Sequence, residues 1–397
     1  MKRVYTFLTI ILLVTAGCGE NTQSSGDFIT VDITKSYPKK ELILQDFMDV
    51  EYIALETTDE FLNQGGVLAV GKEVILVRNQ DDGDIFVYNR TGKGLRKINH
   101  LGRGPQEYMS ISAVILDEDN GELFVIDLFN RILVYDLSGG FKRSFNSKES
   151  TRLSHPYNYD NDNFICLGEP PFDPSSTSSR SFLIISKHDG SITNEIQIPY
   201  IEEKALGGVQ IKVDDNGGWI MSTMTTFFYP LIPYRNDWIV TEFLSDTVFT
   251  SLKDQSMRPF ITRTPPRKKI SHATLLFPGI LSDRYSFMAS IKEDVSTKPM
   301  WPIPNNPVMT VTNLAYDRQQ RAIFTPTVYN GDFSDKREVS MFQKTADNSE
   351  VAFWLSLEAP KLINDLKKGL LKGSLKEIAE KLDEDDNPVI MLVKYKN

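Results

Sequence analysis

The sequence predicts an all-β fold built from repeated four-stranded units, and three observations support this prediction. Short runs of apolar, β-branched or aromatic residues alternate with Asn-Gly, Asp-Gly and Gly-Gly turns, which is the pattern of β-hairpins. The third strands of the first three expected units begin at Ile85, Ile132 and Phe182, at spacings of 47 and 50 residues. Helix signals are confined to the end of the chain. Four antiparallel strands that recur every ~40 to 50 residues are typical of a β-propeller blade.

The first 17 residues have the pattern of a secretory signal. Lys2 and Arg3 precede an apolar run over residues 4–16, which is too short to span a membrane as a helix, since spanning takes roughly 18 residues or more. The small residues Ala16 and Gly17 before Cys18 resemble the cleavage site of bacterial lipoproteins. We therefore expect residues 1–17 to be removed and Cys18 to carry a lipid anchor in the membrane. The alternative is an ordinary signal peptide with a cysteine there by chance.

Residues 18–27 are small and polar and predict a flexible tether, so the folded domain is expected to span residues 28–397. Cleavage removes Lys2 and Arg3 and changes the formal charge from −9 to −11. An acidic chain without a basic stripe argues against a nucleic-acid partner. Cys166 lies in an apolar run and is expected to be a buried core residue. We expect no metal site and no cofactor.

Four units are expected along the first part of the domain. The first two are complete, and the third lacks a clear first strand. The alternation of apolar runs and turns becomes less regular after residue 254. The expected strands are 67–70, 74–77, 85–88 and 95–98; then 113–116, 123–126, 132–135 and 141–145; then 164–167, 182–186 and 192–198; then 209–213, 219–222, 238–243 and 247–250; and finally 285–291, 308–316 and 322–329.

Two helices are expected near residues 360–382. Pro360 opens the first, Gly373 ends it, and Ser374 with Glu377 forms the capping box of the second. A final strand at 389–395 follows. We expect it to pair with an early strand such as 28–33 and so to close the ring.

Several strings carry a family resemblance: YIALETTDE, LGRGPQEY, FVIDLFNRILVYDLSG and LKEIAEKLDEDDNPVIMLVKY. Together they resemble the six-bladed β-propeller lipoproteins of Bacteroides-type bacteria, and the third string is similar to an NHL repeat. The resemblance implies six blades and a cell-envelope setting at the outer membrane. It implies neither a reaction nor which side of the membrane the domain faces.

Candidate functional residues are few, because the hydrolase, zinc and nucleotide motifs are absent from the sequence. Arg103 either pairs with Glu107 to pin a loop or projects into the central channel to meet an anionic ligand. The run from Asp160 to Asn163 begins like a calcium loop, but Phe164 occupies a ligand position, so a solvated turn is expected.

Aromatic residues among prolines are the candidate ligand-binding groups. Tyr229, Tyr234 and Trp238 lie near Pro230 and Pro233, and Trp301 also lies among prolines. Sugars stack on aromatic rings, so these side chains are candidates for a glycan site. The alternative, which we favour, is that the rings pack between blades.

The sequence thus predicts a non-catalytic binding or interaction module in the cell envelope, for a glycan or a partner protein. The alternative function is a propeller-type glycan hydrolase or lyase whose site is assembled from several blades.

Overall fold

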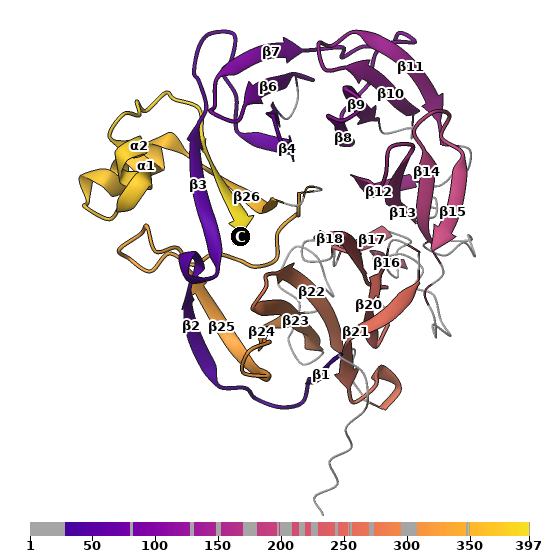
Figure 1. The fold of residues 1–397 in the computed structure, drawn as a ribbon, viewed down its shortest axis with the longest axis vertical. Helices are drawn as coiled ribbons and strands as arrows, with labels where there is room; N and C mark the ends of the chain where they lie inside the picture. The colour runs from indigo at the N-terminus through magenta and orange to yellow at the C-terminus, as the bar shows by residue number, and fades with distance from the viewer. Residues whose placement is uncertain are drawn as a thin grey trace, which may run out of the picture.

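The computed structural model describes residues 28–79, 82–127, 131–147, 152–169, 181–196, 198, 209–213, 219–223, 229–242, 245–252, 254, 256–269, 274–294, 308–346, 348 and 350–396. Within them the chain forms six sheets arranged as blades around a common centre, with two short helices at the rim (Figure 1). The predicted six-bladed β-propeller is therefore confirmed. Among the described residues, no helix is long and apolar enough to cross a membrane.

The first three blades are four-stranded antiparallel meanders, as the sequence predicts. Their central strands are almost wholly buried because both faces of each sheet pack on a neighbouring blade. Blade one contains β4 (Gly66–Val70), β5 (Val74–Arg78), β6 (Ile85–Asn89) and β7 (Gly94–Ile98); blade two contains β8 (Ala113–Asp117), β9 (Glu122–Ile126), β10 (Arg131–Asp136) and β11 (Phe141–Asn146); blade three contains β12 (Arg152–Asn158), β13 (Asn163–Glu169), β14 (Ser181–Ser186) and β15 (Ile192–Ile196).

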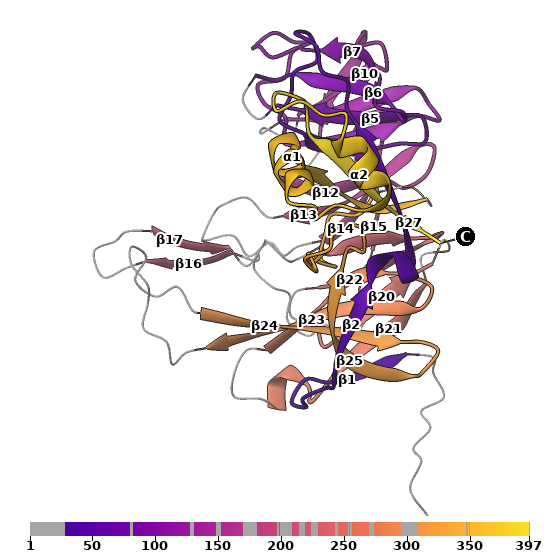
Figure 2. The ribbon, with the colours of Figure 1, turned by 90° about the vertical axis from the view of Figure 1, so that its left-hand side faces the viewer.

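The fourth blade differs from its prediction. Strands β16 (Val209–Val213) and β17 (Trp219–Thr223) form a separate two-stranded sheet that projects from the ring (Figure 2). The blade itself contains β18 (Leu231–Tyr234), β19 (Asp237–Val240), β20 (Thr247–Ser251) and β21 (Met257–Thr264). The prediction was wrong because Asn216-Gly217 is a strong turn signal, whereas the turn between β18 and β19 is Arg235-Asn236, which contains no glycine.

The fifth blade confirms the three strand candidates after residue 254. It contains β22 (Thr274–Leu281), β23 (Tyr285–Asp294), β24 (Val308–Asp317) and β25 (Ala322–Tyr329). Strand β24 pairs with β23 along its whole length but with β25 only over residues 315–317. The β23–β24 hairpin therefore extends beyond the blade, toward the side on which β16 and β17 project (Figure 2).

The sixth blade closes the ring with strands from both ends of the chain: β26 (Val351–Leu357), β27 (Val389–Tyr395) and β3 (Met48–Ala54). The predicted pairing of the last strand with residues 28–33 is wrong. Strand β27 instead pairs antiparallel with β3 over seven residue pairs, a longer ladder than the four pairs that β1 (Ile29–Asp32) makes elsewhere. As expected, strands from both ends of the chain close the ring.

The N-terminal segment also reinforces two further blades. Strand β1 adds in parallel to β21 of blade four, and β2 (Lys39–Ile43) adds in parallel to β25 of blade five, before the short helix η1 (Leu44–Asp46) leads into β3. In Figure 1 these strands run along the rim in indigo. One segment thus supplies the outermost strand of three consecutive blades, across the seam where the ring closes.

The two helices, α1 (Ala359–Lys367) and α2 (Gly373–Ala379), lie between β26 and β27. Pro360 stands in the first turn of α1, as predicted. Gly369, not Gly373, ends α1: its φ is +69°, and the N–H groups of Gly369 and Leu370 bond to the carbonyls of Leu366 and Asp365. The predicted capping box is also wrong, because α2 already begins at Gly373 and its N-cap, Lys372, makes no side-chain cap bond.

Candidate functional site

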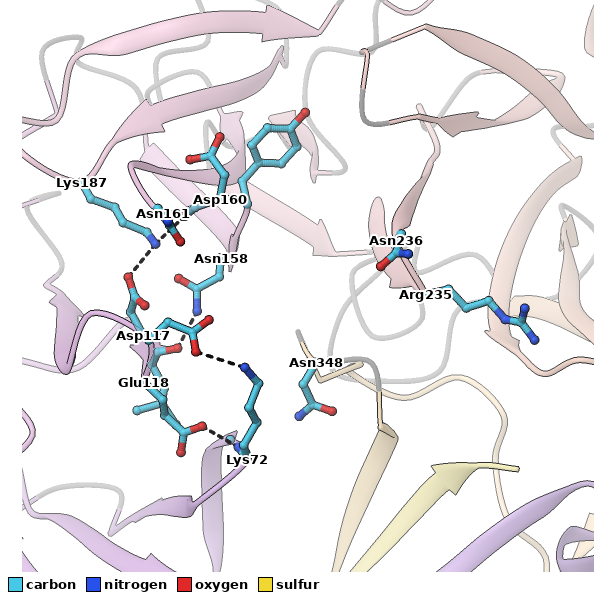
Figure 3. A pocket seen from close by; sticks show the side chains of 14 residues that line it. Lys72, Asp117, Glu118, Asn158, Asp160, Asn161, Lys187, Arg235, Asn236 and Asn348 are labelled. Carbon is cyan, nitrogen blue, oxygen red and sulfur yellow. Dashed lines mark hydrogen bonds and ion pairs between the residues drawn. The ribbon is translucent and has the colours of Figure 1, made fainter. Parts of the chain in front are cut away.

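A polar cavity of about 300 Å³ opens where the inner strands of several blades end (Figure 3). Strands β4, β8, β12 and β18 are the innermost of blades one to four, and the residues that follow each of them turn toward the same face. Its lining consists of Gly71, Lys72, Leu116, Asp117, Glu118, Asp119, Asn158, Tyr159, Asp160, Asn161, Lys187, Arg235, Asn236 and Asn348.

A hydrogen bond crosses the ring near the cavity. The hydroxyls of Tyr157 on β12 and Thr345 share a hydrogen bond of 3.3 Å, and both residues are buried. Thr345 belongs to a segment that bridges to Phe353 of β26, so this bond joins blades three and six across the centre. The space beside it is only about 10 Å³, room for about one water molecule.

A buried ion pair forms one wall of the cavity. Lys187, which follows β14, places Nζ 2.6 Å from Oδ2 of Asp117 at the end of β8, and the two side chains are only 3% and 5% exposed. The same Nζ donates to the carbonyl of Asp160 at 2.7 Å. Because the pair joins blade two to blade three, it sets the distance between two loops of the site.

The remaining carboxylates of the cavity also have partners. Glu118 accepts hydrogen bonds from the backbone N–H groups of Lys72, Glu73 and Val74. Asp119 pairs with Lys72 at 3.0 Å, and this hydrogen bond raises the pKa of the Lys72 ammonium. Asp160 accepts the N–H groups of the two residues that follow Asn161. Each of the four carboxylates is thus held by a cation or by backbone amides.

The run from Asp160 to Asn163 is a turn, as expected, closed by hydrogen bonds to the Asp160 carboxylate. No group of three or more His, Cys, Asp or Glu side chains suited to a metal ion occurs among the described residues.

Two amide side chains face the cavity without partners of their own. Within the described part of the chain, the side chains of Asn161 and Asn236 make no hydrogen bond, and both are exposed. Asn161 lies on the blade-three side and Asn236 across the cavity on the β18–β19 turn (Figure 3). Arg235 points away from the cavity and pairs with Asp283. Its φ is +57°, a conformation that the tight turn imposes.

The three predicted aromatic residues that the structure describes, Tyr229, Tyr234 and Trp238, pack against different neighbours. Trp238 is half-buried, with its ring centre 5.7 Å from Tyr157 and 6.2 Å from Tyr159. Tyr159 lines the cavity, so Trp238 lies behind the wall rather than in it. This is the packing between blades that the sequence offered as the alternative.

The other two tyrosines are also half-buried among neighbours. The Tyr229 ring lies 6.1 Å from His155, and burial raises the pKa of its hydroxyl. Tyr234 donates to the carbonyl of Ser282 at 3.2 Å and packs 5.8 Å from Tyr395. Trp301 and Cys18 lie outside the described residues.

Arg103 lies far from the cavity along its blade. It is exposed on the loop that leads into β8, whereas the cavity is at the other end of that strand. Glu107 accepts the N–H of Gly104 at 2.8 Å, and Arg131 donates to the carbonyls of Gly104 and Glu107. The loop is thus pinned by Arg131 rather than by an Arg103–Glu107 pair.

The sequence analysis missed Asp117, Lys187, Asn161 and Asn236. A signal was present for two of them, since Asp117 and Asn161 fall at or just beyond the ends of successive inner strands. Lys187 follows the third strand of its blade, and its distance from Asp117 along the chain hides the pairing.

The six sheets around a common centre define a six-bladed β-propeller with a polar cavity beside the ends of its inner strands. The chain belongs to the family described as a domain of unknown function (DUF4934), whose model matches residues 28–264. No curated protein matches the sequence.

A solved structure shows the same kind of fold. The chain is similar to a "putative exported protein" of Bacteroides fragilis NCTC 9343, with 13% identity, 93% of this chain and 100% of that chain covered, and a TM-score of 0.56. It is more distantly similar to virginiamycin B lyase from Staphylococcus aureus, with 11% identity, 88% and 100% covered, and a TM-score of 0.36. At 13% identity, the similarity to the B. fragilis structure shows the fold alone.

Proposed function

We propose that this chain is an exported cell-envelope lipoprotein whose propeller is a non-catalytic binding module, with the polar cavity as its ligand site. The ligand is an envelope glycan or a partner protein. The observation that carries the proposal is the polar cavity whose four carboxylates are all held by internal partners.

The state of the carboxylates favours binding over acid–base catalysis. A glycosidase needs one carboxyl group to hold a proton near neutral pH and a second to act as base or nucleophile. Asp117 and Asp119 are each paired with a lysine. Glu118 accepts hydrogen bonds from three backbone amides. None of these three carboxylates can approach a ligand as acid or base without first breaking those contacts. The cavity therefore supports recognition better than proton transfer.

The export and anchoring part of the proposal rests on residues 1–18. The basic start, the apolar run and the small residues before Cys18 support it, and the similar B. fragilis structure is itself described as exported. Mass spectrometry of the mature protein from the membrane fraction tests it. We expect an acylated Cys18 at the N-terminus, and an unmodified N-terminus would contradict it.

The binding part is tested by blocking the cavity. Asn161→Trp fills the cavity from an exposed turn, and Gln106→Trp places the same side chain on the loop at the opposite end of β8. We expect the first variant alone to lose retention of separated envelope polysaccharide or envelope protein fractions on the immobilised full-length protein. Equal retention by both variants would refute the assignment, and release of new reducing ends would establish the enzymatic alternative.

A further inference from the structure

The charged groups of the cavity are engaged by one another or by backbone amides. Four carboxylates stand against two lysines, so the formal charge of the lining is 2 − 4 = −2 when the Arg235 guanidinium, which is directed away to Asp283, is left out. An anionic ligand would meet this excess of negative charge and would compete with the carboxylates for the two ammonium groups. An uncharged polar ligand meets neither cost.

The two amide side chains that make no hydrogen bond within the described part of the protein are suited to bind the hydroxyl groups of a ligand. Asn161 and Asn236 each offer a donor N–H₂ and an acceptor carbonyl, from opposite sides of the cavity. Neighbouring hydroxyls on a sugar ring both donate and accept, so one amide can satisfy two of them. Two such amides, on blades three and four, would hold a ring at both edges.

An aromatic surface completes the lining. Tyr159 lies on the turn that precedes β13, and the Trp238 indole packs against it at 6.2 Å with the two planes 30° apart. The support from blade four holds the Tyr159 ring in place, so little side-chain entropy is lost when a ligand packs on it. Flat apolar faces of this kind bind the C–H faces of sugars.

Resting on the proposed function, we propose that the cavity binds the end of a neutral carbohydrate chain. Tyr159 is the stacking surface, and Asn161 and Asn236 are the hydroxyl partners. The volume of about 300 Å³ lies at the lower end of the ~300 to 1,000 Å³ of small-molecule sites, which fits a terminal sugar rather than a long segment.

The experiment is a glycan array that contains neutral and sulfated oligosaccharides, probed with the full-length protein, followed by calorimetry on the neutral hits. We expect Asn161→Ala and Asn236→Ala each to weaken binding about fivefold to tenfold, the effect of one lost hydrogen bond. Tyr159→Ala should weaken it at least as much, whereas Tyr159→Phe keeps the ring and should bind almost as the parent does. Gln106→Ala, on the far loop, is the matched control and should change nothing.

Salt separates a neutral ligand from a charged one. Binding should be nearly the same at ionic strengths of about 0.05 M and about 0.5 M, because screening acts on charge pairs. Retention of sulfated glycans alone, with steep salt dependence, overturns the inference. If no glycan binds but Asn161→Trp abolishes retention of an envelope protein, the inference fails and the proposed function stands. If Asn161→Trp affects nothing, both fail.

Discussion

Replacing Lys187 with methionine should destabilise the propeller by several kcal/mol, because it leaves Asp117 buried without its cation. Removing one partner of a buried ion pair costs about 3 to 5 kcal/mol. Asp117 is only 5% exposed but keeps hydrogen bonds from the backbone and side chain of Asn120, at 3.2 and 2.9 Å. These remaining bonds place the expected loss near the lower end, at about 3 kcal/mol.

Guanidinium-induced unfolding, followed by circular dichroism, measures this loss. The double variant Lys187→Met with Asp117→Asn removes both charges and should recover most of the stability. Lys72→Met removes a lysine from an exposed pair, in which the two side chains are 67% and 71% exposed, and should show no measurable change.

The two variants together decide the outcome. A loss below about 1 kcal/mol in Lys187→Met, or a double variant no more stable than Lys187→Met alone, would refute the reasoning.

Three further predictions concern residues outside the cavity. The hydrogen bonds from Arg143, helped by Lys142, hold the pKa of Glu122 at about 2, so its stabilisation is complete above the unfolded value of about 4.3 and is lost as the pH falls toward 2. Arg143→Met should move that loss to higher pH, as NMR titration of the Glu122 carboxyl would show, and an unchanged titration would contradict it. Gly121→Ala should cost about 1 kcal/mol, because φ is +62° but the added carbon meets open space. Gly92→Ala, at φ +85°, should cost two to three times as much in the same unfolding assay, because its Cβ would lie 2.0 Å from the carbonyl oxygen of Ala54; equal losses would show that the backbone conformation alone matters. Cys166 is fully buried and burial raises the pKa of its thiol, so it should react with a thiol reagent only at the rate of unfolding, and fast labelling of the native protein would contradict its place in the core.

Local sequence patterns were sufficient to predict the strands and turns of the regular blades. The turns at Gly121 and Gly139 have positive φ, and the strands between them carry short apolar runs, so both the strands and their connections can be read residue by residue. Prediction of turns from glycine failed in blade four, where the turn residue with positive φ is Arg235. It also failed at α2, where helix packing against the core, not the Ser374 side chain, determines where the helix begins.

The candidate site was accessible to sequence reasoning only in part. Aromatic and proline-rich runs directed attention to Tyr229, Tyr234 and Trp238, which lie half-buried among other side chains. The residues that line the cavity are ordinary turn residues, and nothing in their local sequence separates them from other surface turns. Asn161 and Asn236 are 75 positions apart and line the same cavity only because blades three and four are adjacent.

The sequence by itself determined the all-β class, the strands of the regular blades and the expected location in the cell envelope, because each depends on residues within a few positions of one another. The tertiary structure alone decided which strands close the ring, that Tyr157 and Thr345 meet across its centre, and that four carboxylates with internal partners line one cavity. These features join residues from different blades. Their interaction energies depend on side chains that only the closed ring brings within a few ångströms of one another. Asp117 and Lys187, for example, are 70 positions apart in the sequence and form a hydrogen bond in the folded chain.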